Sequence, residues 1–130
     1  MSRAPRLLAV DDDAASAELI VRVAERCGYE AFATSDSRGV LSLVDALNPA
    51  VMSVDISMPH VDALELFRLL AARPYRGRIL IVSGQDDQTL MIAQRSARVA
   101  GLDCPAAYQK PIDMARLRQT LLDTTLTPAG

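Results

Sequence analysis

The sequence is poor in the residues that mark several protein classes. Its 130 residues include two cysteines, one histidine, no tryptophan and only 4% aromatic residues. No apolar stretch is long enough to span a membrane, and the first residues do not form the pattern of a signal peptide. Two isolated cysteines without nearby histidines make no metal site. We therefore expect a cytoplasmic protein with reduced thiols that does not associate with a membrane.

Basic residues are not in excess either. The chain has 14 lysines and arginines against 16 acidic residues, a formal net charge of −2 and a pI near 5.3. A nucleic-acid binder needs a basic surface that neutralises phosphates. We therefore expect no direct contact with nucleic acid, and any control of a gene would come through another domain or another chain.

The chain does contain enough apolar material for one core. Half of its residues are hydrophobic and 23% are charged, which is ordinary for a folded domain. This length suffices for one domain with a sizeable core and is too short for two. We expect the domain to cover residues 1–124, and residues 125–130 to be a tail or the start of a linker.

Short apolar runs alternate with segments of helical periodicity along the chain. The runs predict strands at 6–10, 29–34, 50–54, 78–82 and 106–109. The periodic segments predict helices at 14–27, 37–47, 62–72, 87–100 and 112–123. This alternation predicts an α/β fold, a parallel sheet with helices on both faces. The common strand order for five strands is 2-1-3-4-5, the flavodoxin-like arrangement.

Polar residues close four of the predicted strands. Parallel strands all end on one edge, where ligands bind at the switch point between the first and third strands. The fold would therefore bring the polar residues to one rim. They are Asp11, Asp12, Asp13, Asp55, Ser83 and Lys110.

The chemistry of this rim points to a divalent cation and phosphate. Crowded carboxylates repel one another unless a cation joins them, and Mg²⁺ is bound by carboxylates together with phosphate oxygens. Asp55 would then attack phosphorus, as carboxylates do in aspartyl-phosphate chemistry. Lys110 would pair with one phosphoryl oxygen as a point charge, and the Ser83 hydroxyl would donate a hydrogen bond to another.

Each of these residues also has a purely structural interpretation. One aspartate of the Asp11–Asp13 run would suffice to cap the next helix, so three in a row favour a site. Asp55 alone is equally compatible with a loop, and Ser83 with a turn. Lys110 is the only lysine beside 13 arginines. Since an ammonium and a guanidinium are not interchangeable, Lys110 indicates a specific role.

Three other residues are expected to be structural. Cys27 lies on the apolar face of a predicted helix, where free cysteine behaves as a small core residue. His60 is the only histidine and is expected to be a solvated loop residue. Tyr108 is expected to pack against its neighbours.

In order and spacing, four motifs resemble the receiver domains of two-component response regulators. The resemblance extends from about Arg6 to Leu122. The motifs are LLAVDDD with the acidic pair Asp11 and Asp12, VMSVDISMPHVDALEL with the phosphoacceptor Asp55, ILIVSG with Ser83, and YQKPI with Lys110 and Pro111.

The resemblance implies a metal site and a phosphoryl donor. Mg²⁺ would be held by Asp12, Asp55 and the backbone carbonyl of Ser57, with Asp11 contributing through water. A histidine kinase or phosphotransfer protein would donate the phosphoryl group. The chain would not act as an enzyme beyond self-phosphorylation from a donor and slow self-dephosphorylation.

The resemblance also implies a switch. Phosphorylation would draw Ser83 inward and shift the face made by the fifth strand and its flanking helices, which a downstream effector domain or protein would recognise. The Lys110–Pro111 bond would often be cis. A homodimer through the face of the fourth helix, fifth strand and fifth helix is one further option.

Three features depart from the family pattern. Many members have an aromatic residue three positions before the lysine, where this chain has Ala107, with Tyr108 one place later. His60 and Ala63 stand where the loop often carries glycines. The stretch 85–107 runs slightly long and resembles receivers attached to cyclic-di-GMP phosphodiesterase domains.

Three alternatives remain beside a working receiver. A haloacid-dehalogenase-type phosphohydrolase would use Asp11 as nucleophile and Asp13 as its partner, but the chain lacks room for a substrate cap and Asp55 would have no role. A degenerate receiver would serve only as a binding module, and failure to bind Mg²⁺ would favour it. A flavodoxin-like cofactor binder shares the fold, but the Asp11–Asp13 run would repel a flavin phosphate.

Overall fold

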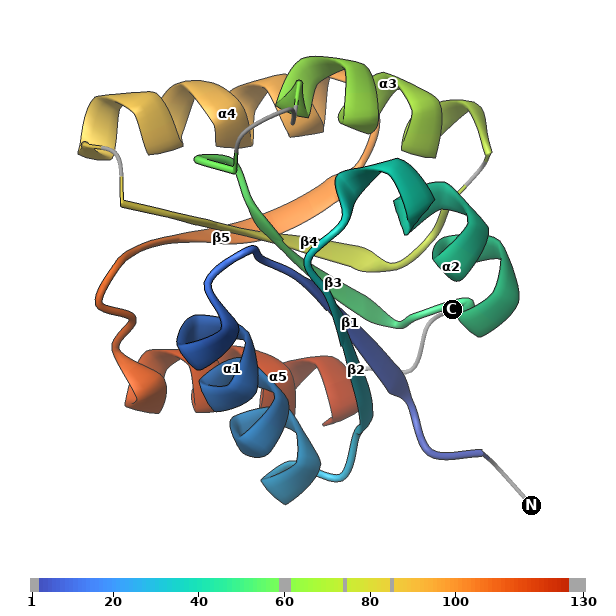
Figure 1. Ribbon diagram of the computed structural model, residues 1–130, viewed down its shortest axis with the longest axis vertical. Coiled ribbons are helices and arrows are strands. Elements are labelled where there is room, and N and C mark those ends of the chain that lie inside the picture. Colours follow the sequence, from blue (N-terminus) through green and yellow to red (C-terminus); the bar gives the residue numbers. More distant parts are fainter. Residues whose placement is uncertain (1–2, 59–61, 74, 85, 127–130) are drawn as a thin grey trace.

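The computed structural model describes residues 3–58, 62–73, 75–84 and 86–126, with residues 125 and 126 described by their backbone alone. Within them a central sheet is covered by helices on both faces (Figure 1). The strands are β1 (Arg6–Val10), β2 (Glu30–Thr34), β3 (Val51–Asp55), β4 (Arg78–Ser83) and β5 (Asp103–Gln109). The helices are α1 (Ala14–Arg26), α2 (Val40–Leu47), α3 (Ala63–Ala72), α4 (Asp87–Val99) and α5 (Met114–Leu126), with a 3₁₀ turn at Ser37–Gly39.

The sheet has the predicted topology. All neighbouring strands are parallel and their order is β2-β1-β3-β4-β5. Helices α1 and α5 lie on one face, and α2, α3 and α4 on the other (Figure 1). The carboxyl ends of the strands therefore share one edge, and the order reverses between β1 and β3, where ligands bind in sheets of this type.

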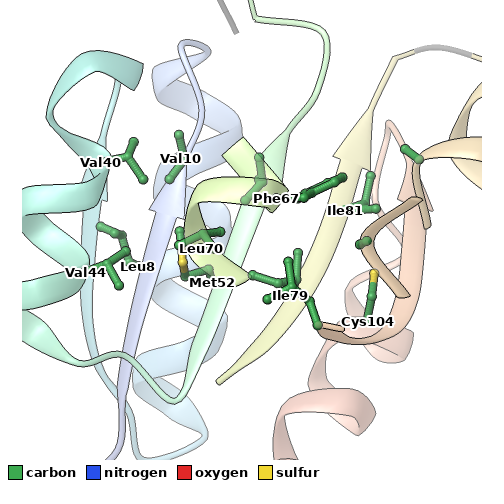
Figure 2. Close-up of a cluster of buried hydrophobic side chains, with 14 of the residues drawn as sticks. Leu8, Val10, Val40, Val44, Met52, Phe67, Leu70, Ile79, Ile81 and Cys104 are labelled. Carbon is green, nitrogen blue, oxygen red and sulfur yellow. The ribbon is translucent and has the colours of Figure 1, made fainter. Parts of the chain in front are cut away.

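Each face of the sheet buries its own apolar cluster, because successive strand side chains point to opposite faces. Toward α2, α3 and α4, the strand residues Leu8, Met52 and Ile79 pack with Phe67 and Leu70 (Figure 2). Toward α1 and α5, Leu7 and its neighbours pack with helix residues in the same way. That second cluster includes Leu7, Ala9, Val51, Leu80, Val82, Ile20, Leu117 and Leu121.

Aspartates open four of the five α-helices and the 3₁₀ turn, whereas α2 begins after Gly39 without a side-chain cap. In each case a carboxylate accepts a hydrogen bond from a backbone N–H of the first turn, which has no partner within the helix. These capping residues are Asp13, Asp36, Asp62, Asp86 and Asp113. Five of the 16 acidic residues thus have a capping role, which Asp11, Asp12 and Asp55 do not share.

Two predicted boundaries were wrong at the C-terminal end of the domain. Strand β5 begins at Asp103, three residues before the predicted start. It is an edge strand, where Pro105 is tolerated although proline cannot donate to a ladder. Helix α5 continues to Leu126, so residues 125 and 126, predicted as tail, are helical. Residues 127–130 lie outside the described residues.

Both cysteines are free thiols, but Cys27 is less buried than expected. Cys27 was expected to be buried, but it follows the last residue of α1 and is only partly buried, at the margin of the cluster between α1, α5 and the sheet. Cys104 on β5 is the buried thiol. Tyr108 packs in the core as expected. His60 lies outside the described residues.

Candidate functional site

Asp55 is the last residue of β3 and is held at both carboxylate oxygens. The Ser57 backbone N–H donates to Oδ1 at 2.8 Å, and the Ser57 hydroxyl donates to the same oxygen. Oδ2 lies 3.0 Å from the Lys110 ammonium nitrogen. The side chain is almost fully buried, so its direction is fixed by three donors at the carboxyl edge of the sheet.

Asp11, directly after β1, lies beside Asp55 and is equally buried. The Asp13 backbone N–H donates to its Oδ1 at 2.9 Å. Lys110 Nζ lies 3.2 Å from Oδ1 and 3.1 Å from Oδ2. The approach to Oδ2 is close enough for an ion pair, but among the described residues no donor has the direction of a hydrogen bond to that oxygen.

Lys110 bridges the two buried carboxylates. It directly follows β5, and its backbone N–H donates to the Ser83 carbonyl at 2.8 Å, which ties the lysine to the end of β4. The peptide bond to Pro111 is cis, as the family resemblance implied. The Lys110 side chain is mostly buried, so the only lysine of the chain is directed into the acidic site.

The three consecutive aspartates have different roles. Asp12 is exposed, and one ligand oxygen each from Asp11, Asp12 and Asp55 lie within 4.8 Å of one another. Asp13 points elsewhere, since its carboxylate accepts hydrogen bonds from the Ala15 backbone N–H and the Ser16 hydroxyl at the start of α1. The phosphohydrolase alternative needs Asp13 in the site, and this geometry counts against it.

Burial and hydrogen bonding separate the ionisation of the two buried acids. Burial raises the pKa of Asp11 to about 6. Burial acts on Asp55 in the same direction, but hydrogen bonds from Ser57 and Lys110 outweigh it and hold that pKa below its usual range. Burial would lower the pKa of Lys110, but hydrogen bonds to both carboxylates raise it. The site therefore contains an ionised Asp55 facing a charged ammonium.

The donor set fits Mg²⁺. One ammonium cannot neutralise three carboxylates whose ligand oxygens lie within 4.8 Å of one another. Hard oxygen donors from one or two carboxylates are typical Mg²⁺ ligands. Asp11, Asp12 and Asp55 would hold the ion. Its two positive charges would offset the negative charge of the three carboxylates. The backbone carbonyl of Ser57 as a fourth ligand stays a prediction.

Ser83 ends β4 next to the site and is fully buried. Asp55 pairs with Val82 in the sheet register, so Ser83 lies one residue further along the neighbouring strand. The structure thus brings together Asp11, Asp12, Asp55, Ser83 and Lys110 at the carboxyl ends of four strands, as predicted. Their catalytic and metal-binding roles stay predictions.

The sequence interpretation missed what Ser57 does with its side chain and N–H. It assigned only the Ser57 carbonyl, whereas both donors of Ser57 hold Asp55. An aspartate that accepts from the N–H two residues on is an Asx turn, for which Asp55-Ile56-Ser57 is a suitable sequence. This local pattern was the available signal.

The fold and the site define a flavodoxin-like α/β domain with an acidic, lysine-bridged site at its switch point. The sequence matches the family model of the response regulator receiver domain over residues 7–122. The chain therefore belongs to the response regulator receiver family of two-component signalling systems. In the described ranges, no helix has both the length and the hydropathy that crossing a membrane requires.

Known response regulators resemble this chain in sequence and in structure. Response regulator MprA of Mycolicibacterium vanbaalenii is 34% identical over 126 residues, which make up 92% of this chain and 52% of that protein. The chain thus spans about half the length of the curated relatives it matches. A response regulator from Colwellia psychrerythraea superposes with a TM-score of 0.80 at 25% identity, covering 96% of this chain and 100% of that one. A signal receiver domain from Bermanella marisrubri superposes with a TM-score of 0.77 at 28% identity, covering 95% of this chain and 99% of that one.

Proposed function

We propose that this chain takes a phosphoryl group on Asp55 in a Mg²⁺-dependent reaction and thereby changes its interaction surface. The donor would be a histidine kinase or a phosphotransfer protein, and the recipient of the signal a downstream effector domain or protein. The observation that carries the proposal is the Lys110 ammonium 3.0 Å from Asp55 Oδ2 and 3.1 Å from Asp11 Oδ2. This arrangement supports charge neutralisation at the acceptor carboxylate.

In the transfer step, a carboxylate oxygen of Asp55 attacks the phosphorus atom of the donor. A bond forms between that oxygen and phosphorus while the bond from phosphorus to the donor breaks, and the donor leaves with the electron pair. Bound Mg²⁺ supplies charge neutralisation and orientation of the phosphoryl oxygens. Ser57 fixes the direction of the attacking carboxylate through its two hydrogen bonds to Oδ1.

After transfer, Lys110 and Ser83 would bind the phosphoryl oxygens. Lys110 already contacts the acceptor carboxylate, so its ammonium needs little movement to pair with a phosphoryl oxygen. Ser83 is fully buried at the end of the neighbouring strand. Its hydroxyl would donate to a second oxygen and draw the segment after β4 toward Asp55.

The switch would work without an aromatic side chain at residue 107. Ala107 on β5 is only partly buried, and the next residue cannot replace the missing ring. Tyr108 is 2% exposed, its hydroxyl shares a hydrogen bond with Thr120, and the Arg116 guanidinium lies 5.3 Å from its ring centre. We propose that the backbone of β5 and α4 carries the response instead.

A hollow on the proposed output face supports a partner there. Residues of α4, β5 and α5 line an open hollow of about 390 Å³, among them Leu90, Met91 and Ala107 together with the polar Asp87, Gln94 and Arg116. Met91 and Ile92 expose large apolar side chains on α4. An effector or a second copy of the chain would cover this face, and which of the two does so stays a prediction.

Intact mass spectrometry tests the proposal. The native chain is incubated with acetyl phosphate, or with a phosphorylated histidine phosphotransfer protein, in Mg²⁺ and in excess chelator. We expect a gain of one phosphoryl group that requires Mg²⁺. A chain that gains nothing from either donor would instead be a receiver that serves only as a binding module.

A further inference from the structure

One interior hydroxyl lies in the apolar face of the sheet beneath the acidic site. Ser53, in the middle of β3, is 1% exposed. Among the residues that the structure describes, its Oγ has no hydrogen-bond partner. Interior hydroxyls nearly always bond to protein or to an ordered water. A serine here is therefore a feature that packing alone does not explain.

The sheet register places Ser53 directly below the site. Side chains two residues apart on a strand share a face, so Ser53 lies one row beneath Asp55. Ser53 pairs with Ala9 of β1, and Asp11 follows two residues after Ala9. Ser53 is thus diagonal to Asp11, on the face that α1 and α5 cover.

A second oxygen on the same face also has unused capacity. Asp11 Oδ2 is buried, and among the described residues it accepts no hydrogen bond, although Lys110 Nζ lies 3.1 Å away. In the row that holds Ser53, its partner on β1 is the small Ala9, and its partner on β4 is the larger Leu80. A water bound there would have these two oxygens as its polar partners, beside the small side chain of Ala9.

We propose that Ser53 is a positioning residue for the acidic site, its hydroxyl joined to the Asp11 carboxylate by one enclosed water molecule. The water donates one hydrogen to Asp11 Oδ2 and shares a second hydrogen bond with Ser53 Oγ, which can accept or donate. This link holds the carboxylate of Asp11 in one orientation. The inference rests on the proposed Mg²⁺-dependent function, because its consequence is tighter Mg²⁺ binding.

The competing explanation is a hydroxyl without any partner. Removing such a group from the interior stabilises a protein and would leave the acidic site as it was. Removing a hydrogen-bond partner of a metal ligand instead lowers metal affinity, by about 10-fold to 100-fold when the partner is bonded directly. The first explanation therefore predicts an unchanged Mg²⁺ affinity when the Ser53 hydroxyl is removed, and the second predicts a lower one.

Calorimetric titration with Mg²⁺ compares the native chain with Ser53→Ala and Ser53→Thr. We expect Ser53→Ala to weaken Mg²⁺ binding about tenfold and Ser53→Thr, which keeps the hydroxyl, to restore it to within about threefold of the native value. Ser96→Ala is the matched control, because the Ser96 hydroxyl bonds to Ile92 O within α4. The Mg²⁺ affinity of Ser96→Ala should equal that of the native chain.

Equal Mg²⁺ affinities for the native chain and Ser53→Ala overturn this inference alone. A native chain that binds no Mg²⁺ overturns the proposed function as well. If Ser53→Ala does not fold, a high-resolution crystal structure of the native chain decides the matter. An ordered water within hydrogen-bond distance of both Ser53 Oγ and Asp11 Oδ2 supports the inference, and its absence there contradicts it.

Discussion

Lys110 and Asp55 meet at 3.0 Å although 55 residues separate them in the chain. The contact exists because β3 and β5 end at the same edge of the sheet, with β4 between them. Lys110 also contacts Asp11, so the strands on either side of the switch point are joined through one ammonium. This relationship explains why the chain uses its single lysine there.

Replacing Lys110 should separate metal binding from switching. Lys110→Ala removes the ammonium but none of the carboxylates, so we expect Mg²⁺ affinity equal to or above that of the native chain. Phosphorylation should slow by about 100-fold, the usual cost of one lost charge-stabilising donor. Hydrogen exchange along β5 and α4 should not change on phosphorylation of this variant. A native-like exchange response in this variant would remove Lys110 from the mechanism.

Removing the Ser57 hydroxyl should change the ionisation of Asp55. Ser57→Ala deletes one of the hydrogen bonds that hold the pKa of Asp55 low, so that pKa should rise toward its ordinary value. Carboxyl-carbon NMR titration measures the shift. Ser16→Ala is the control, because that hydroxyl bonds to Asp13 outside the site. An unchanged Asp55 titration in Ser57→Ala would contradict the hydrogen-bond assignment.

The Tyr108 hydroxyl should matter for stability and not for signalling. Tyr108→Phe deletes the hydrogen bond to Thr120 while keeping the buried ring, so the free energy of unfolding should fall by about 1 kcal/mol. Urea denaturation measures this change. The phosphorylation rate and the exchange response should match those of the native chain, and a loss of either would give Tyr108 a part in the switch.

The two thiols should differ in reactivity. Burial raises the pKa of Cys104 to about 11, so at pH 8 it is both inaccessible and protonated, whereas Cys27 is only partly buried. We expect Cys27→Ser to react with a thiol reagent at pH 8 only after unfolding, and Cys104→Ser to react in the folded state. Rapid labelling of folded Cys27→Ser would show that β5 opens readily.

The strand order could be predicted, and the strand boundaries to within one residue apart from the start of β5, because buried parallel strands appear as uninterrupted apolar runs. Strand β1 was predicted with its observed bounds. Strand β5 was predicted too short, since Asp103 and Pro105 are atypical of strands and are accepted here by an edge position. The end of α5 was missed because polar residues dominate its last turns.

The members of the site could be predicted from the strand ends, but their individual contacts could not. The sequence places three aspartates after β1, and only the structure separates the capping Asp13 from the buried Asp11. Ser53 lies within an apolar run, so its sequence context indicates nothing beyond strand packing. Its position diagonal to Asp11 depends on the register between β1 and β3, which sequence periodicity does not determine.

Replacement of Asp55 tests the central claim most directly. Native chain, Asp55→Asn and Asp13→Asn are incubated with acetyl phosphate and Mg²⁺, and their intact masses are measured. Asp13→Asn is the matched control, because asparagine also caps helices well and Asp13 lies outside the acidic cluster. We predict one added phosphoryl group on the native chain and on Asp13→Asn, and none on Asp55→Asn. A phosphoryl group retained by folded Asp55→Asn would contradict the assignment of Asp55 as the acceptor.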